Sequence, residues 1–170
     1  MLKKKLIFIG GTAVLFLMCI LVTLHSTRYQ AAKLLDMDLP DLPRPVDAQV
    51  MDNHGVWFGD GELYGKLTFD QSNGEALEER LAEHDGWEKL PLPENVTLLL
   101  YGGEKDGIHY GSPLADGWGS PTVTEGYYYF LDRLHDRKDD ALLLNDSAIN
   151  VTIAIYDSQQ AVLYFMTYDT

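Results

Sequence analysis

The strongest constraint on the fold is a two-residue alternation near the C-terminus. Between Ile149 and Ile155, large aliphatic residues occupy every odd position, with Asn, Thr and Ala between them. This period of two is typical of a β-strand with one buried face. The polar residues 157–160 can turn the chain, and residues 161–168 can return as an antiparallel partner. The sequence therefore predicts a β-hairpin at the C-terminal end.

Four other segments have readable local patterns. Residues 45–51, 62–69 and 125–134 have strand composition. A helix is predicted over residues 72–83, where Ser72 and Glu75 fit a capping box and Gly86 can end the helix. Prolines and glycines interrupt residues 87–123, so we expect loop there, with a short helix or strand over residues 93–101.

These elements predict an α+β fold. Five strands with hairpin-type connections and no βαβ alternation indicate a mainly antiparallel sheet of about five strands, with one or two packed helices. The length of the segment after residue 45 suits one domain with one core.

The N-terminal region is strongly apolar. Three lysines at positions 3–5 precede residues 6–24, which contain no charge and would span roughly 28 Å as a helix. This pattern predicts a single-pass transmembrane signal-anchor in the cell membrane, with the lysines cytoplasmic and the C-terminal domain extracytoplasmic. The expected organisation is residues 1–29 as cytoplasmic lysines and anchor, 30–45 as a helix extension and Pro/Asp-rich spacer, and 46–170 as the extracytoplasmic domain.

The charge and cysteine content limit the partners. The chain carries a net charge of −13, and all its acidic residues follow position 35, which disfavours nucleic acid as a partner. The single cysteine, Cys19, lies in the apolar run, so no disulfide is expected in the domain. The expected partners are the lipid bilayer, through residues 6–24, and an envelope protein or wall polymer.

No established catalytic or cofactor motif occurs in the sequence. No cofactor is expected, and the histidines at positions 54, 84, 109 and 135 lack the spacing of a helical metal site, so no metal is expected. The candidate acid–base pair is His54 with Asp60, in glycine-rich loops. A turn role for the aspartates is the favoured alternative.

Two candidate binding features lie in the strand at 125–134. Asp132 and Arg133 could bind a polar ligand, although a structural ion pair is the simpler interpretation. Tyr127 and Tyr129 belong to a tyrosine-rich group that would form a contact surface if its sheet face were exposed. Coverage of that face by residues 87–123 is the alternative.

Several runs carry a family resemblance. Residues 52–55 with 59–61, then 126–133, 155–158 and 163–165 resemble a group of uncharacterised single-pass membrane proteins of Gram-positive, clostridia-like bacteria. The likeness covers about residues 45–168. It implies a short N-terminal membrane helix and a small extracytoplasmic domain, and it implies no activity.

Three functional hypotheses follow. The favoured one is a non-catalytic, membrane-anchored module that binds an envelope protein or wall component. The alternative is an enzyme acting on envelope material through His54 and Asp60. A regulatory subunit working through the membrane helix is the third.

Overall fold

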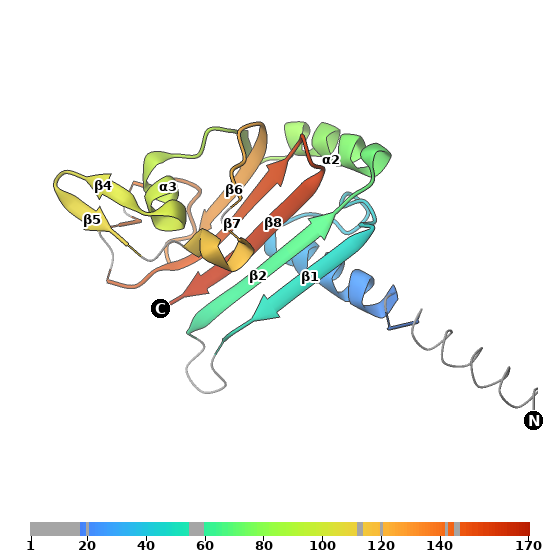
Figure 1. Ribbon diagram of the computed structural model, residues 1–170, viewed down its shortest axis with the longest axis horizontal. Coiled ribbons are helices and arrows are strands. Elements are labelled where there is room, and N and C mark those ends of the chain that lie inside the picture. Colours follow the sequence, from blue (N-terminus) through green and yellow to red (C-terminus); the bar gives the residue numbers. More distant parts are fainter. Residues whose placement is uncertain are drawn as a thin grey trace, which may run out of the picture.

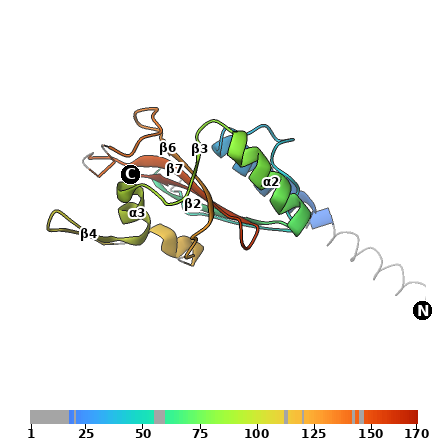
Figure 2. The same cartoon turned by 90° about the horizontal axis from the view of Figure 1, so that it is seen from above.

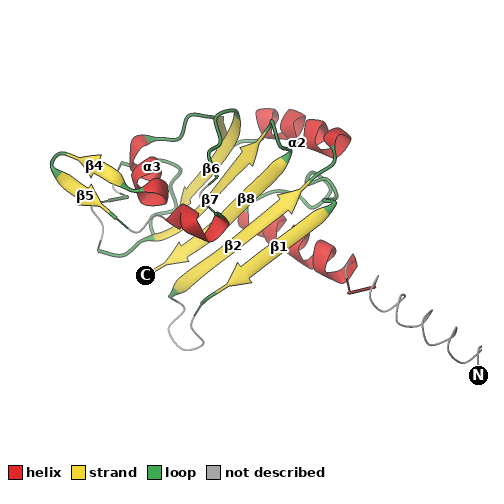
Figure 3. Ribbon diagram, viewed as in Figure 1, coloured by secondary structure: helices red, strands yellow, loops and turns green. Residues whose placement is uncertain are grey.

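A computed structural model describes residues 18–19, 21–54, 60–111, 114–119, 121–141, 143–144 and 147–170. Its main element is a six-stranded antiparallel sheet with the order β1-β2-β8-β7-β6-β3 (Figures 1 and 3). The strands are β1 (Asp47–Asp52), β2 (Gly61–Thr68), β3 (Trp87–Lys89), β6 (Gly126–Asp132), β7 (Asn150–Asp157) and β8 (Val162–Asp169). The predicted α+β class with a mainly antiparallel sheet is confirmed, and β3 adds an edge strand that the sequence did not reveal.

The C-terminal hairpin is the centre of this sheet. β7 and β8 pair along their whole length, from Asn150 with Asp169 to Asp157 with Val162. β2 pairs with the outer side of β8, and β6 with the outer side of β7. Both central strands are buried on both faces, because their two sets of alternating side chains enter two separate cores.

Each face of the sheet has its own cover (Figure 2). One face packs against α2 (Gln71–Glu83) and a helix at residues 21–34, and its core includes Leu77, Leu81 and Phe165. The opposite face packs against α3 (Glu94–Tyr101) and the 3-10 helix η1 (Leu114–Trp118), around Val96, Leu100 and Ile153. A small hairpin of β4 (Gly103–Lys105) and β5 (Ile108–Tyr110) follows α3.

The helix predicted over residues 72–83 is confirmed as α2, but its cap differs. The Asp70 side chain, rather than that of Ser72, accepts the hydrogen bond from the Asn73 backbone N–H at 2.9 Å. Asp70 Oδ2 also accepts from the Asn73 side chain at 2.9 Å. An aspartate at this position satisfies an unpaired amide of the first turn, which a serine two residues later cannot do once the helix has begun.

The predicted helix extension is present, because the helix runs to residue 34, but the segment after it packs on the sheet and does not form an extended spacer. Leu35 and Leu42 are fully buried against the sheet. The Arg28 guanidinium donates hydrogen bonds to the carbonyl oxygens of Leu39 at 2.6 Å and Leu42 at 2.7 Å, which ties the proline-rich segment to the helix. Proline stops the helix here, but apolar residues between the prolines keep the chain on the protein surface.

The predicted transmembrane signal-anchor is corrected by the structure. Among the described residues, no helix combines the length and the apolar character that a membrane crossing requires. The described end of the predicted span belongs to the helix at 21–34, which buries Thr27, Ala31 and Ala32 in the protein. Residues 6–17 and Ile20 of that span lie outside the described residues. The expected location of the domain outside the cell stays a prediction.

We expect Leu42→Ala to lower the free energy of unfolding by about 2–5 kcal/mol, because it removes a fully buried side chain from the core. Urea unfolding followed by circular dichroism measures this change. The matched control is Asp38→Ala, an exposed position in the same segment, with an expected change within about 0.5 kcal/mol. Equal stability of the two variants would contradict the packing of this segment.

Candidate functional site

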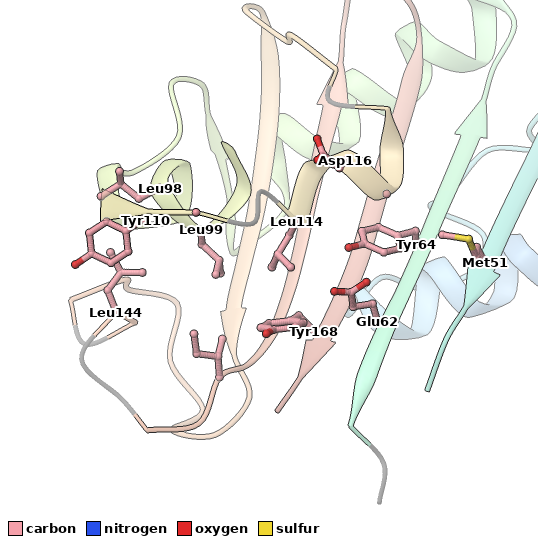
Figure 4. A pocket seen from close by; sticks show the side chains of 13 residues that line it. Met51, Glu62, Tyr64, Leu98, Leu99, Tyr110, Leu114, Asp116, Leu144 and Tyr168 are labelled. Atoms are coloured by element: carbon pink, nitrogen blue, oxygen red, sulfur yellow. The ribbon is translucent and has the colours of Figure 1, made fainter. Parts of the chain in front are cut away.

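The best-formed site is a cavity of about 640 Å³ on the sheet face that carries α3 and η1. It opens between the ends of β2 and β8 on one side and the α3–β5 region on the other (Figure 4). Its walls come from seven separate parts of the chain, which are the strands β1, β2 and β8, α3, the end of β5, η1 and the loop before β7. The lining residues are Met51, Glu62, Tyr64, Leu98, Leu99, Tyr110, Gly111, Leu114, Asp116, Gly117, Leu144, Ile149 and Tyr168.

Tyr64 forms the wall nearest the sheet and is held by two residues of η1. The Trp118 ring packs edge-on against it, with ring centroids 6.1 Å apart. A Cβ on Gly117 would lie 2.3 Å from the Tyr64 ring, so only glycine lets η1 approach this closely. Trp118 is itself fixed, because its Nε1 donates to the backbone oxygen of Phe165 at 3.1 Å. The Tyr64 ring is therefore a rigid part of the site.

The polar groups of the cavity are acidic or neutral. Tyr64 donates a hydrogen bond to Glu62, and both side chains point toward the space beside Leu114 and Tyr168 (Figure 4). Burial raises the pKa of Tyr64, and the negative charge of Glu62 raises it further. The Tyr64 hydroxyl therefore keeps its proton near neutral pH and acts as a donor. Asp116, on η1, contributes a second carboxylate to the lining.

The remaining lining is mainly apolar. Leucines and one isoleucine cover the side away from the sheet, and none of the thirteen lining residues is lysine, arginine or histidine. A concave, mostly apolar cavity with a few fixed polar groups is the usual form of a small-ligand site. The two carboxylates in this surrounding give a negative potential, which favours a cation over an anion.

His54 lies on the other face of the sheet. Tyr168 lines the cavity, so the next residue, Asp169, points to the opposite face. His54 Nε2 lies 3.0 Å from Asp169 Oδ2, and Nδ1 lies 2.6 Å from Asp52 Oδ1. No hydrogen bond or ion pair between the described atoms joins His54 to Asp60, and their acid–base role stays a prediction.

The environment of His54 changes its acidity. Burial lowers the pKa of the ring, but hydrogen bonds to Asp52 and Asp169 outweigh burial and raise the pKa above the ordinary value. The backbone and side-chain hydrogen bonds from His54 lower the pKa of Asp52. The protonated ring between two carboxylates therefore stabilises the end of the sheet, where β1 and β8 finish.

Asp132 and Arg133 do not act as a pair. Asp132 is buried and accepts from Arg137 Nη2 at 2.6 Å and from His135. Burial raises the pKa of Asp132, but the hydrogen bonds from Arg137 and His135 bring it below the ordinary value. Arg133 Nη2 instead donates to Asp169 Oδ1 at 2.7 Å. The ion pair predicted between Asp132 and Arg133 therefore does not form, and Arg133 instead extends the His54–Asp169 network.

Tyr127 and Tyr129 are not available for binding. They are 7% and 1% exposed and belong to the core under α2. The other tyrosine-rich face is covered by α3 and η1, so the alternative of coverage by residues 87–123 is correct. Within the described ranges, no group of three or more His, Cys, Asp or Glu residues could hold a metal ion.

No sequence pattern marks the residues that form the cavity. Glu62, Tyr64 and Tyr168 lie in segments predicted as strands, where their alternation indicated only one face of a sheet. Leu99 and Leu114 come from the segment expected to be mostly loop. Their convergence depends on strand register and on where η1 packs, and neither is visible in local periodicity.

A scan against protein-family models, a search of curated proteins and a search of solved structures each returned no match. The resemblance to single-pass proteins of Gram-positive bacteria therefore stays a prediction. The function has to be inferred from the geometry of the chain itself.

We expect His54→Gln to destabilise the protein more at about pH 5.5 than at about pH 8.5. The pKa of His54 is higher in the folded than in the unfolded chain. Its contribution to stability is therefore fully present below about pH 6.5 and is lost as the pH rises through the folded pKa. Urea unfolding of both proteins at the two pH values measures this difference.

The control for this test is His109→Gln, at an exposed position on β5, which we expect to change the free energy of unfolding by less than about 0.5 kcal/mol at either pH. A loss in His54→Gln that is the same at both pH values, or larger at the higher pH, would contradict a stabilising charged ring.

Proposed function

We propose that this chain is a non-catalytic binding domain whose cavity accepts an aliphatic group ending in a cation, such as a lysine side chain or another primary amine. One observation carries the proposal, which is the cavity of about 640 Å³ with two carboxylates and an apolar wall but no cationic lining residue. Such a lining matches a ligand that is apolar along its stem and positive at its end.

The positions of the polar groups support this choice of ligand. Glu62 already accepts a hydrogen bond from Tyr64, and its position at the cavity keeps acceptor capacity for an entering ammonium group (Figure 4). Leucine side chains from α3 and η1 can contact a methylene chain and remove it from water. An anion would meet two negative charges with no positive side chain among the lining residues.

The charge of the whole chain points in the same direction. A net charge of −13 accelerates encounter with positively charged partners and opposes encounter with negatively charged ones. The partner class expected from the sequence, an envelope protein or wall component, is compatible with such a ligand, since proteins and peptide-bearing polymers both carry primary amines. We include that class in the proposal.

The geometry does not support the enzyme alternative in the form predicted. Neither His54 nor Asp60 is among the residues that line the cavity. Both ring nitrogens of His54 face carboxylates that hold the ends of strands, Asp52 and Asp169. A base positioned for proton transfer needs access to a substrate atom, and this ring is instead part of a structural network.

The test uses three six-carbon probes of similar size, hexylammonium, hexan-1-ol and hexanoate. We expect the ammonium probe to bind with the highest affinity and to shift the NMR signals of Leu99, Leu114 and Tyr168. Glu62→Gln should weaken its binding by about tenfold, because a hydrogen bond to a charged group is worth about 1.5–3 kcal/mol.

Glu104→Gln is the matched control, because Glu104 is exposed on β4 and is not among the lining residues. We expect it to leave the affinity unchanged. The proposal would be wrong if hexan-1-ol or hexanoate bound as tightly as hexylammonium, or if Glu62→Gln and Glu104→Gln had the same affinity as the original chain.

A further inference from the structure

The outer edge of β1 is open. β1 is the last strand of the six-stranded sheet and, within the part of the chain that the structure describes, pairs only with β2 (Figure 1). Five of its six residues are exposed, among them Val50 at 42% and Met51 at 46%. The opposite edge differs, because β3 there has only three residues. β1 is therefore the longer free edge of the sheet.

The register identifies the backbone groups that point outward. The Asn53 N–H donates to the Glu62 oxygen at 2.8 Å, one residue beyond the end of β1. In an antiparallel pair such bonded positions recur every second residue, which assigns Gln49 and Met51 to bonds with β2. The N–H and C=O groups of Ala48 and Val50 consequently point away from the sheet.

The side chains of β1 do not protect this edge. Natural edge strands are commonly shielded by lysine, by proline or by a charge in the middle of the strand. In β1 the charges are at the two ends, on Asp47 and Asp52, and the four residues between them are Ala, Gln, Val and Met. This uncharged stretch is long enough to bond with an added strand.

A second copy of the chain is a poor occupant of the edge. In a two-fold pair of β1 strands, the residues with outward backbone groups, Ala48 and Val50, would have to pair with each other. Each copy carries a net charge of −13, which opposes this association. A segment with positive residues removes this penalty.

A hollow beside the edge could accommodate a side chain of the added strand. It has a volume of about 260 Å³ and lies on the η1 face, next to Tyr64 and Trp118. Three of its lining residues are the consecutive β1 residues 49–51. An added strand would direct alternate side chains to this face, so one apolar side chain could enter the hollow.

We propose that the β1 edge binds an extended, positively charged segment of a partner protein as a seventh strand, with a basic residue opposite Asp47 and uncharged residues opposite residues 48–51. Backbone hydrogen bonds from Ala48 and Val50 supply the pairing. Asp52 is already bonded to His54, so Asp47 and the net charge of −13 select for the basic segment. The hollow shares Met51, Tyr64 and Gly117 with the amine-binding cavity, whereas the pairing residues Ala48 and Val50 do not line that cavity.

The probe is the peptide acetyl-Lys-Thr-Val-Thr-Val-Lys-amide, titrated into the full chain labelled with nitrogen-15. We expect the amide signals of Ala48 and Val50 to shift, and a peptide with glutamate in place of both lysines to bind at least about tenfold more weakly. N-methylation at alternate peptide residues tests the pairing without changing the protein. Methyl groups on the residues that face β1 should abolish binding, and those on the other residues should not.

Val50→Pro tests the same edge from the protein side. It removes an outward N–H that β2 does not use, so the sheet can form while the added strand loses a donor. We expect binding to fall at least about tenfold while the circular dichroism spectrum is retained. If this variant fails to fold, the N-methylated peptides still test whether the peptide pairs with β1 through backbone hydrogen bonds.

Four results would overturn the proposal. These are equal binding of the lysine and glutamate peptides, equal binding of the two N-methylated forms, full binding by folded Val50→Pro, and a dimer in sedimentation that Val50→Pro dissociates. The last result would assign the edge to a second copy of the chain. Glu62→Gln should leave peptide binding within about twofold of the original, which distinguishes failure at this edge from failure at the cavity.

Discussion

The fold depends on the burial of β7 and β8 on both faces. A two-layer α+β domain can leave one sheet face in water, but here the hairpin directs aliphatic and aromatic side chains to both sides. Each side then needs a cover, since exposing either set would leave a large apolar surface in water. α2 and the helix at residues 21–34 cover one face, and α3 with η1 covers the other (Figure 2).

This arrangement also explains where the sites lie. The helix pair covers its face far enough that even Tyr127 and Tyr129 are buried. On the other face, α3 and η1 are short and leave space between them at the ends of β2 and β8. The cavity occupies that space, and the sheet supplies its rigid wall through Tyr64. A short cover on a long sheet thus produces the cavity.

The charged groups have structural and functional roles in different places. At the ends of β1, β6 and β8, Asp169 joins His54 to Arg133, and Asp132 binds Arg137. In these contacts positive and negative groups are paired. In the cavity, by contrast, Glu62 lies beside a tyrosine and apolar side chains with no cation in the lining. The charges at the strand ends are paired, whereas the acidic cavity has no cation in its lining. This difference indicates a positively charged ligand.

The sequence by itself determined the secondary structure of the main strands, the position of α2 and the α+β class. These follow from local periodicity, because any tertiary structure that buries one face of each element requires the same spacing of apolar residues. The sequence did not determine that residues 31–42 pack on the sheet. Prolines that stop a helix are compatible both with an extended spacer and with a segment that packs against the domain. Only the tertiary structure decided that His54 faces Asp52 and Asp169 instead of Asp60, and that Glu62, Tyr64 and Leu114 line one cavity. Apart from the local His54–Asp52 contact, these contacts join residues far apart in the chain. Strand register and the docking of η1 set them, so no local pattern encodes them.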